Sequence, residues 1–127
     1  MFVNRRSESM PTNQEIEEIY GKKSALREKL FNANEKVLET NSLLKTRKAY
    51  IINTTDKKTL GTNDKEREAY ILEHTRDIFD ELEELESEKR SLDLEYSLIC
   101  DKIECIQCQI RNEQAAADCE AQRLGVI

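Results

Sequence analysis

The stretch that decides the fold is residues 71–110, which read ILEHTRDIFDELEELESEKRSLDLEYSLICDKIECIQCQI. Apolar side chains recur in it at alternating steps of three and four residues, the spacing of a coiled-coil heptad. Thr75 and Lys89 are its polar interruptions. The repeat predicts a long helix with one apolar seam, made of Ile71, Ile78, Leu82, Leu85, Leu92, Tyr96, Ile99, Ile103, Ile106 and Ile110.

A second heptad pattern precedes this stretch. Thr12 and Glu15 form a capping-box pattern, in which the hydroxyl and the carboxylate each accept a hydrogen bond from an exposed backbone amide. The apolar columns that follow predict a first helix over residues 12–53, with polar flaws at positions such as Lys23 and Thr40.

A connector over residues 54–63 breaks both patterns with Thr, Asn, Asp and Gly61. Those residues favour turns, because their side chains compete for backbone hydrogen bonds and glycine permits a positive φ. Asn63 and Glu66 form a second capping pattern, so a second helix is expected over residues 64–122. A connector this short predicts that the helices fold back as an antiparallel hairpin.

A fold-back centred near Leu60 would place Ile16 opposite about Glu104 and leave the chain after Cys105 without cover from the first helix. One continuous bent rod is the alternative, and the turn-forming connector disfavours it. The predicted fold is all-α: an antiparallel helical hairpin with coiled-coil heptads that assembles into an oligomeric bundle. Its expected organisation is a disordered lead over 1–11, one domain over 12–122 and a tail over 123–127.

A second apolar stripe lies on the second helix, off the main seam. Its residues are Leu94, Leu98, Cys105 and Cys108, and their steps of four, seven and three place them on one helical face. A helix that is apolar on two sides usually lies inside a bundle. The stripe therefore predicts self-association; a locally thicker core within one chain is the other interpretation.

Composition limits the function classes. The chain has 127 residues, a net charge of −6 and a sequence pI of about 5.0, which argues against a free-standing nucleic-acid-binding domain. No apolar run approaches the roughly 18 residues needed to span a membrane. The four cysteines all fall within the last 28 residues and show no disulfide framework, so a reducing cytoplasm is expected.

The cysteines include a Cys-Ile-Gln-Cys motif at Cys105 and Cys108, a spacing found in zinc and redox sites. Here the pair falls mid-helix between isoleucines, whereas zinc sites of this spacing usually use a tight turn. Buried packing as small apolar residues is the expected role, and no cofactor or metal is expected. A metal shared between chains and a redox or inter-chain disulfide role are the alternatives.

No catalytic constellation is present in the sequence. His74 is the sole histidine, and there is no Gly-rich phosphate loop, no Ser/His/Asp arrangement and no histidine pair for metal hydrolysis. A catalytic site also needs a concavity that a thin helical hairpin does not easily supply. The chain is therefore expected not to be an enzyme.

Charge is distributed unevenly along the chain. Nine acidic residues lie between Asp77 and Glu95, against two basic ones. They form either a solvated coiled-coil face or a rigid acidic surface for a partner, centred on Asp80, Glu81, Glu83, Glu84 and Glu88. Basic residues gather near the predicted turn, where a weak nucleic-acid contact is an alternative to simple helix-end electrostatics: Lys45, Arg47, Lys48, Lys57, Lys58 and Lys65.

The connector and the start of the second helix read GTNDKEREA at residues 61–69. This segment resembles a Gly-x-Asn-x-x-x-Arg-x-Ala-like turn in small coiled-coil proteins of tailed bacteriophages and prophages, often encoded beside single-strand annealing recombinases. The matching positions are Gly61, Asn63, Arg67 and Ala69, and the resemblance covers about residues 45–110. It implies a phage-encoded accessory protein without catalytic residues.

Two functions follow as expectations. The first is a homo-oligomeric adaptor that serves DNA replication or recombination machinery in the host cytoplasm. The second is an anti-defence inhibitor, such as an anti-CRISPR or a nuclease inhibitor, that blocks a host protein through the acidic surface. Both involve a protein partner and neither requires a membrane.

Overall fold

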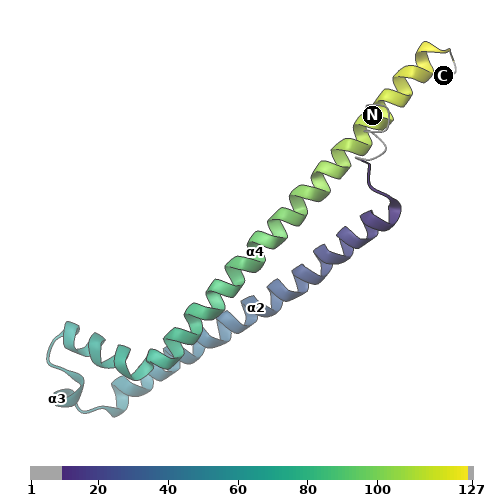
Figure 1. Ribbon diagram of the computed structural model, residues 1–127. Coiled ribbons are helices and arrows are strands. Elements are labelled where there is room, and N and C mark those ends of the chain that lie inside the picture. The colour runs from purple at the N-terminus through teal and green to yellow at the C-terminus, as the bar shows by residue number, and fades with distance from the viewer. Residues whose placement is uncertain (1–9, 126–127) are drawn as a thin grey trace, which may run out of the picture. The chain divides into compact units, whose positions relative to one another are not determined.

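The computed structural model describes residues 10–125, and helices make up nearly all of this range. Helix α2 spans Asn13–Thr54, α3 spans Lys57–Leu60 and α4 spans Asp64–Arg123 (Figure 1). Residues 10–125 contain no strand, so the predicted all-α class is confirmed. Most of the predicted lead and the last two residues of the predicted tail lie outside the described residues.

Helix α2 begins with the cap that the sequence predicts. The Thr12 amide donates to Glu15 Oε2 at 3.4 Å, and the Glu15 amide donates to Thr12 Oγ1 at 3.2 Å. This reciprocal pair satisfies two backbone N–H groups that have no partner within the helix. Local side-chain chemistry therefore fixes where the helix starts.

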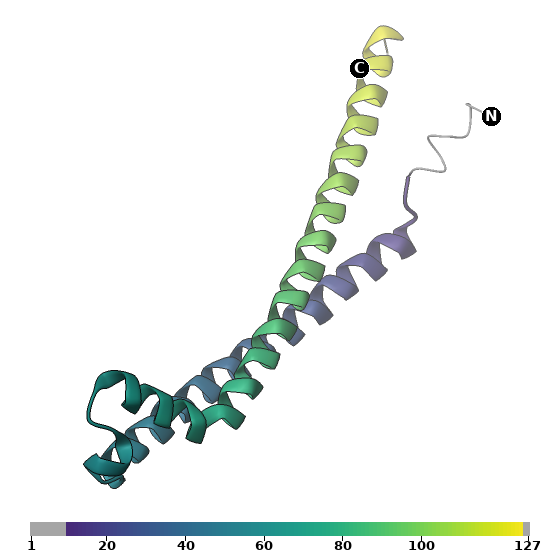
Figure 2. The ribbon, with the colours of Figure 1, turned by 60° about the vertical axis from the view of Figure 1, so that its left-hand side comes forward.

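The connector contains a helical turn that the sequence analysis did not predict. Lys57–Leu60 form α3, which Figure 2 shows between the end of α2 and the start of α4. The Leu60 amide donates to the Asp56 carbonyl oxygen at 2.9 Å, and the Leu60 side chain is buried. Burial of this single apolar residue explains why a polar segment coils here instead of remaining an open loop.

Gly61 ends α3 in a backbone conformation that favours glycine, with φ at 124°. An added Cβ would lie 2.7 Å from Glu66 Cβ and 3.0 Å from the Arg67 amide nitrogen. Both the dihedral and the close approach therefore require the absence of a side chain.

The first turn of α4 is held by side-chain hydrogen bonds. The Glu66 amide donates to Asn63 Oδ1 at 2.9 Å, while Glu66 Oε2 accepts from the Thr62 amide at 2.9 Å. Arg67 Nη2 pairs with Asp64 Oδ1 at 2.9 Å. Ala69, the last matching position of the resemblance, is exposed.

Replacing Gly61 with alanine is expected to lower the free energy of unfolding by about 3 kcal/mol, because an L residue is strained at this φ and its Cβ meets Glu66. The measurement is thermal or urea unfolding followed by circular dichroism. Gly21→Ala is the matched control: an added Cβ there meets nothing within 4 Å, and alanine in a helix should stabilise by about 0.5–1 kcal/mol. Equal effects of the two substitutions would contradict the special role of Gly61.

Contacts between residues group the chain into two compact units. Unit 1 consists of the residues up to Arg27 together with those from Leu94 onward, and unit 2 consists of residues 28–93. In both units a segment of α2 packs against a segment of α4 that runs in the opposite direction (Figures 1 and 2).

The core of unit 2 is a cluster of Val37, Leu44, Ile78 and Leu82, against which the half-buried Leu85 packs. The polar seam position Thr75 is tolerated in the core because its hydroxyl finds a local partner. Thr75 is only 1% exposed, and its Oγ1 donates to the Ile71 carbonyl oxygen at 2.7 Å.

Unit 1 is packed less completely. Leu26 and Ile103 are its buried apolar residues among the described part of the chain, and most other seam residues in it are half-buried. Gln107 Nε2 donates to the Tyr20 hydroxyl at 3.1 Å and so joins α4 to α2. This polar link was not predicted.

Candidate functional site

The ten seam residues predicted on the second helix separate by unit. In unit 2, Ile78 and Leu82 are buried, and Ile71, Leu85 and Leu92 are half-buried. In unit 1, Ile103 is buried, Ile110 is 39% exposed, and the rest are half-buried: Tyr96, Ile99 and Ile106. The cluster in unit 2 shows that seam side chains pack against α2 of the same chain.

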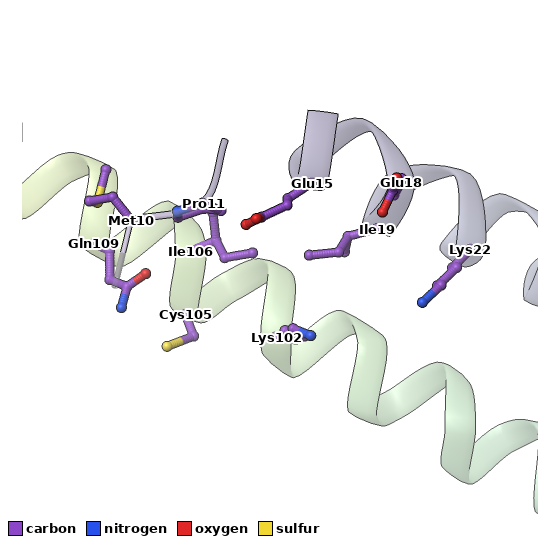
Figure 3. A pocket seen from close by; sticks show the side chains of 10 residues that line it. All are labelled: Met10, Pro11, Glu15, Glu18, Ile19, Lys22, Lys102, Cys105, Ile106 and Gln109. Carbon is purple, nitrogen blue, oxygen red and sulfur yellow. The ribbon is translucent and has the colours of Figure 1, made fainter. Parts of the chain in front are cut away.

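A groove in unit 1 shows how α2 and α4 pair there. Figure 3 shows Ile19 and Ile106 pointing toward each other across it, with Pro11 and Gln109 at one end. The predicted register, with Ile16 opposite Glu104 and no cover after Cys105, is therefore wrong by several residues. The turn of α3 keeps Leu60 helical, so the chain reverses slightly later, at residues 61–63.

The groove has an apolar floor and charged edges. Ile19 and Ile106 form the floor, while Glu15 and Glu18 on α2 and Lys102 on α4 line its sides. Its volume is about 390 Å³ and it is open to solvent. The sequence did not predict this groove, because an apolar seam predicts that two helices pack together but not where they separate enough to leave a groove.

The outward stripe is our name for Leu94, Leu98, Cys105 and Cys108, the second apolar stripe predicted on α4. Leu94 is 63% exposed and Leu98 is 60% exposed, and both cysteines are exposed. In Figure 3 the Cys105 side chain projects away from α2, on the other side of α4 from Ile106. The stripe thus forms an apolar surface that α2 does not cover.

The expectation that the cysteines are buried is wrong for three of them. Cys105, Cys108 and Cys119 are exposed, and Cys100 is half-buried; all four are free thiols. Helical periodicity correctly separates these residues from the seam, but it does not tell what lies over the second face. Cys119 falls fourteen residues after Cys105, close to four full turns, and so continues the outward stripe.

No metal centre is found among residues 10–125, where no three His, Cys, Asp or Glu side chains gather closely enough to hold an ion. Arg111 Nη2 donates to Cys108 Sγ at 3.3 Å. His74 stacks on Tyr70 with ring centroids 4.1 Å apart, and its Nδ1 donates to the Tyr70 carbonyl oxygen at 2.9 Å. These contacts give His74 a local structural role on the surface of α4.

The predicted acidic surface lies on α4 in unit 2. All five of its carboxylates are exposed, and none of them belongs to an ion pair within residues 10–125: Asp80, Glu81, Glu83, Glu84 and Glu88. Unpaired and solvated carboxylates keep their charge available to a partner of opposite sign.

The predicted basic residues of unit 2 are all exposed as well: Lys45, Arg47, Lys48, Lys57, Lys58 and Lys65. Lys57 and Lys58 lie on α3 and line an open hollow together with Arg67. The Arg67 guanidinium is already engaged by Asp64 and by the Asn63 carbonyl oxygen. Among residues 10–125, neither lysine of the hollow makes an ion pair, and the side chains there do not form a phosphate site.

Comparison with family models, with curated proteins and with solved structures finds no match to this chain. Within residues 10–125, no helix combines the length and the apolar character needed to cross a bilayer.

Proposed function

We propose that this chain is a non-enzymatic interaction protein that associates with a second copy of itself through the outward stripe of α4. The observation that carries the proposal is the exposure of Leu94 and Leu98, which leaves two large apolar side chains four residues apart in contact with water. Neighbouring exposed apolar side chains commonly mark an interaction surface, whereas isolated ones need no explanation.

The energy available from the stripe sets the expected strength. Full burial of a leucine contributes about 1.5–3 kcal/mol, so two leucines from each of two copies contribute about 6–12 kcal/mol. Association costs about 4–15 kcal/mol in lost freedom. The two ranges overlap, so the complex should depend on concentration and should gain from burial of the Cys105 and Cys108 side chains on the same stripe.

Asp101 favours one direction of pairing. It lies seven residues after Leu94, on the same face, and is exposed. A parallel in-register pair would bring the two Asp101 carboxylates together, and like charges facing each other are destabilising. An antiparallel two-fold pair centred near Cys105 places each Asp101 near Gln109 of the other copy instead. We therefore expect the antiparallel arrangement.

The test is light scattering coupled to size-exclusion chromatography, under reducing conditions, over two decades of protein concentration and with and without a chelator. The proposal expects a mass that rises from one chain toward a discrete assembly and is insensitive to the chelator. A single-chain mass at every concentration would refute self-association. The outward stripe would then be a binding surface for a different protein.

The resemblance of residues 61–69 to a turn of phage coiled-coil proteins supports a proposal for the biological role of the assembly. On that basis the assembly is an adaptor encoded by a phage, acting with proteins of DNA replication or recombination in the host cytoplasm. Partner capture with the assembled protein and with a dissociated variant tests this step, because an adaptor should lose its partner when the assembly is lost.

A second function is favoured by one further observation, the absence of ion pairs at the acidic surface within residues 10–125. In this alternative the protein is an inhibitor that occupies a basic nucleic-acid channel of a host defence protein. Regularly spaced carboxylates on a rigid helix suit such a channel by charge complementarity.

Reversing Glu81, Glu83, Glu84 and Glu88 to lysine is expected to weaken binding to a basic nuclease by at least about 100-fold, because charge pairing becomes repulsion. Helix content should stay unchanged, since these side chains are exposed. Binding is measured by fluorescence anisotropy at low and physiological salt, with circular dichroism for folding.

The matched control for this experiment reverses four exposed glutamates of α2 and makes the same change in net charge: Glu17, Glu28, Glu35 and Glu39. Equal loss in both variants would mean that only overall charge matters. Retained affinity in the α4 variant would exclude the acidic surface as the contact.

A further inference from the structure

Cys105 and Cys108 form a pair of exposed thiols one helical turn apart on the outward stripe. Residues three positions apart in a helix are surface neighbours, with about 5–6 Å between their Cβ atoms. A disulfide requires Cβ atoms about 3.5–4.5 Å apart. Bond formation therefore needs only a local tightening of one turn of α4, by about 1–2 Å.

The other two cysteines have no such neighbour. Cys119 lies fourteen residues beyond Cys105, about 21 Å along a helix axis. Cys100 lies five residues before Cys105, so its side chain points to a different side of α4, and it is half-buried. Within one chain, Cys105 and Cys108 are thus the pair that helix geometry brings within reach of a bond.

Arg111 contacts one of the two sulfurs. Its Nη2 donates to Cys108 Sγ at 3.3 Å, whereas the Cys105 thiol is exposed at the edge of the unit 1 groove. The thiolate is the form of a cysteine that attacks a disulfide. Either cysteine of the pair can make the first attack, because the other then lies one helical turn away.

We propose that Cys105 and Cys108 are a thiol–disulfide exchange site whose oxidant is a low-molecular-weight disulfide such as oxidised glutathione. The thiolate of one cysteine attacks one sulfur of the oxidant, forms a mixed disulfide and releases one glutathione thiolate. The thiolate of the other cysteine then attacks the protein sulfur of that mixed disulfide, forms the internal disulfide and releases the second glutathione thiolate. The protein pair loses two electrons and two protons, and the oxidant becomes two thiols.

The tightened turn should make the Cys105–Cys108 disulfide easier to reduce. A disulfide away from its preferred geometry stores strain and is more easily reduced, and exposed, strained disulfides are typically the labile and regulatory ones. The site should therefore respond reversibly to the cellular thiol pool. This chemistry lies within one chain and belongs to the separate chain, in which both thiols are exposed, because the proposed self-association would cover the outward stripe.

The experiment uses the full chain with Cys100→Ser and Cys119→Ser, so that two thiols remain. The protein is incubated at low concentration in glutathione buffers of graded redox ratio, quenched with acid and analysed by intact mass and peptide mapping. The expected product is a monomer that has lost two hydrogens, with Cys105 linked to Cys108, and reduced glutathione should reverse it.

A spacing control carries Cys108→Ser and Asn112→Cys in the same background. It keeps two exposed thiols on the same face but separates them by two turns, about 10 Å, which one disulfide cannot bridge. This variant should accumulate the glutathione mixed disulfide and form no internal bond. The proposal is overturned if the Cys105/Cys108 protein also stops at the mixed disulfide, or if it forms only disulfides between chains.

Discussion

Replacing Ile78 with aspartate is expected to unfold unit 2. Ile78 is 4% exposed and belongs to the cluster with Val37, Leu44 and Leu82. Loss of a buried isoleucine costs about 2–5 kcal/mol, and a carboxylate without a partner in this apolar cluster adds a desolvation penalty. A total of about 4 kcal/mol or more would remove much of the stability of an ordinary domain, about 5–15 kcal/mol.

The measurement is thermal unfolding followed by circular dichroism, where a change of this size lowers Tm by about 15 °C or leaves no folding transition. Phe31→Asp is the matched control in the same unit, because Phe31 is 64% exposed and its replacement removes a larger apolar side chain. A control Tm within a few degrees of the parent would show that burial, and not the new charge, determines the loss. Similar Tm values for the two variants would argue against the cluster as the core of unit 2.

Replacing Leu94 and Leu98 together with aspartate is expected to prevent the proposed self-association while leaving each chain folded. Each copy loses two apolar side chains that association would bury, and the paired chains gain four carboxylates facing a desolvated surface. The dissociation constant should rise at least about 100-fold, equivalent to about 2.7 kcal/mol. Light scattering over the same concentration series measures the shift.

Folding of this variant should be almost unaffected, because surface substitutions usually change stability by about 0.5 kcal/mol or less. The control adds the same two charges without removing leucine, through Ser97→Asp and Gln114→Asp, both at exposed positions. If the control dissociates as readily as the leucine variant, net charge and not the stripe governs association. If the leucine variant keeps the parent mass, another surface holds the copies together.

The two experiments separate surfaces that sequence periodicity treats alike. A charge in the seam, for example at Leu92 or Ile99, would be expected from sequence alone to test assembly. In the structure both residues are half-buried on α4, whereas Leu94 and Leu98 are well exposed. Seam substitutions therefore test folding of the chain, and stripe substitutions test contact between chains.

The bounds of the long helices could be predicted closely because their signals are local. Thr12 and Glu15 exchange hydrogen bonds within one turn, and Asn63 accepts from an amide three residues away. Burial of Ile78 and Ile103 was also predictable, since seven-residue spacing is a property of the sequence itself. None of these predictions required knowledge of distant contacts.

The features that sequence missed depend on contacts across the chain. The single turn of α3 forms because Leu60 finds cover, which a residue-by-residue view of a polar segment does not reveal. The pairing of Ile19 with Ile106 follows from where the chain reverses. When the centre of the turn is misplaced by about two residues, the residue opposite each position changes by about four. Exposure of Cys105 could not be deduced either, because periodicity identifies a face but not its neighbours.

The chain has no tryptophan, so its intrinsic fluorescence comes from tyrosine. Tyr20, whose hydroxyl accepts a hydrogen bond from Gln107, can therefore report on the folding of unit 1. Tyr20 and Tyr96 belong to unit 1, and Tyr50 and Tyr70 belong to unit 2. Replacing both tyrosines of one unit with phenylalanine would leave tyrosine fluorescence from the other unit only. Thermal unfolding of these two variants, followed by tyrosine fluorescence, would show whether the two units unfold together or in succession.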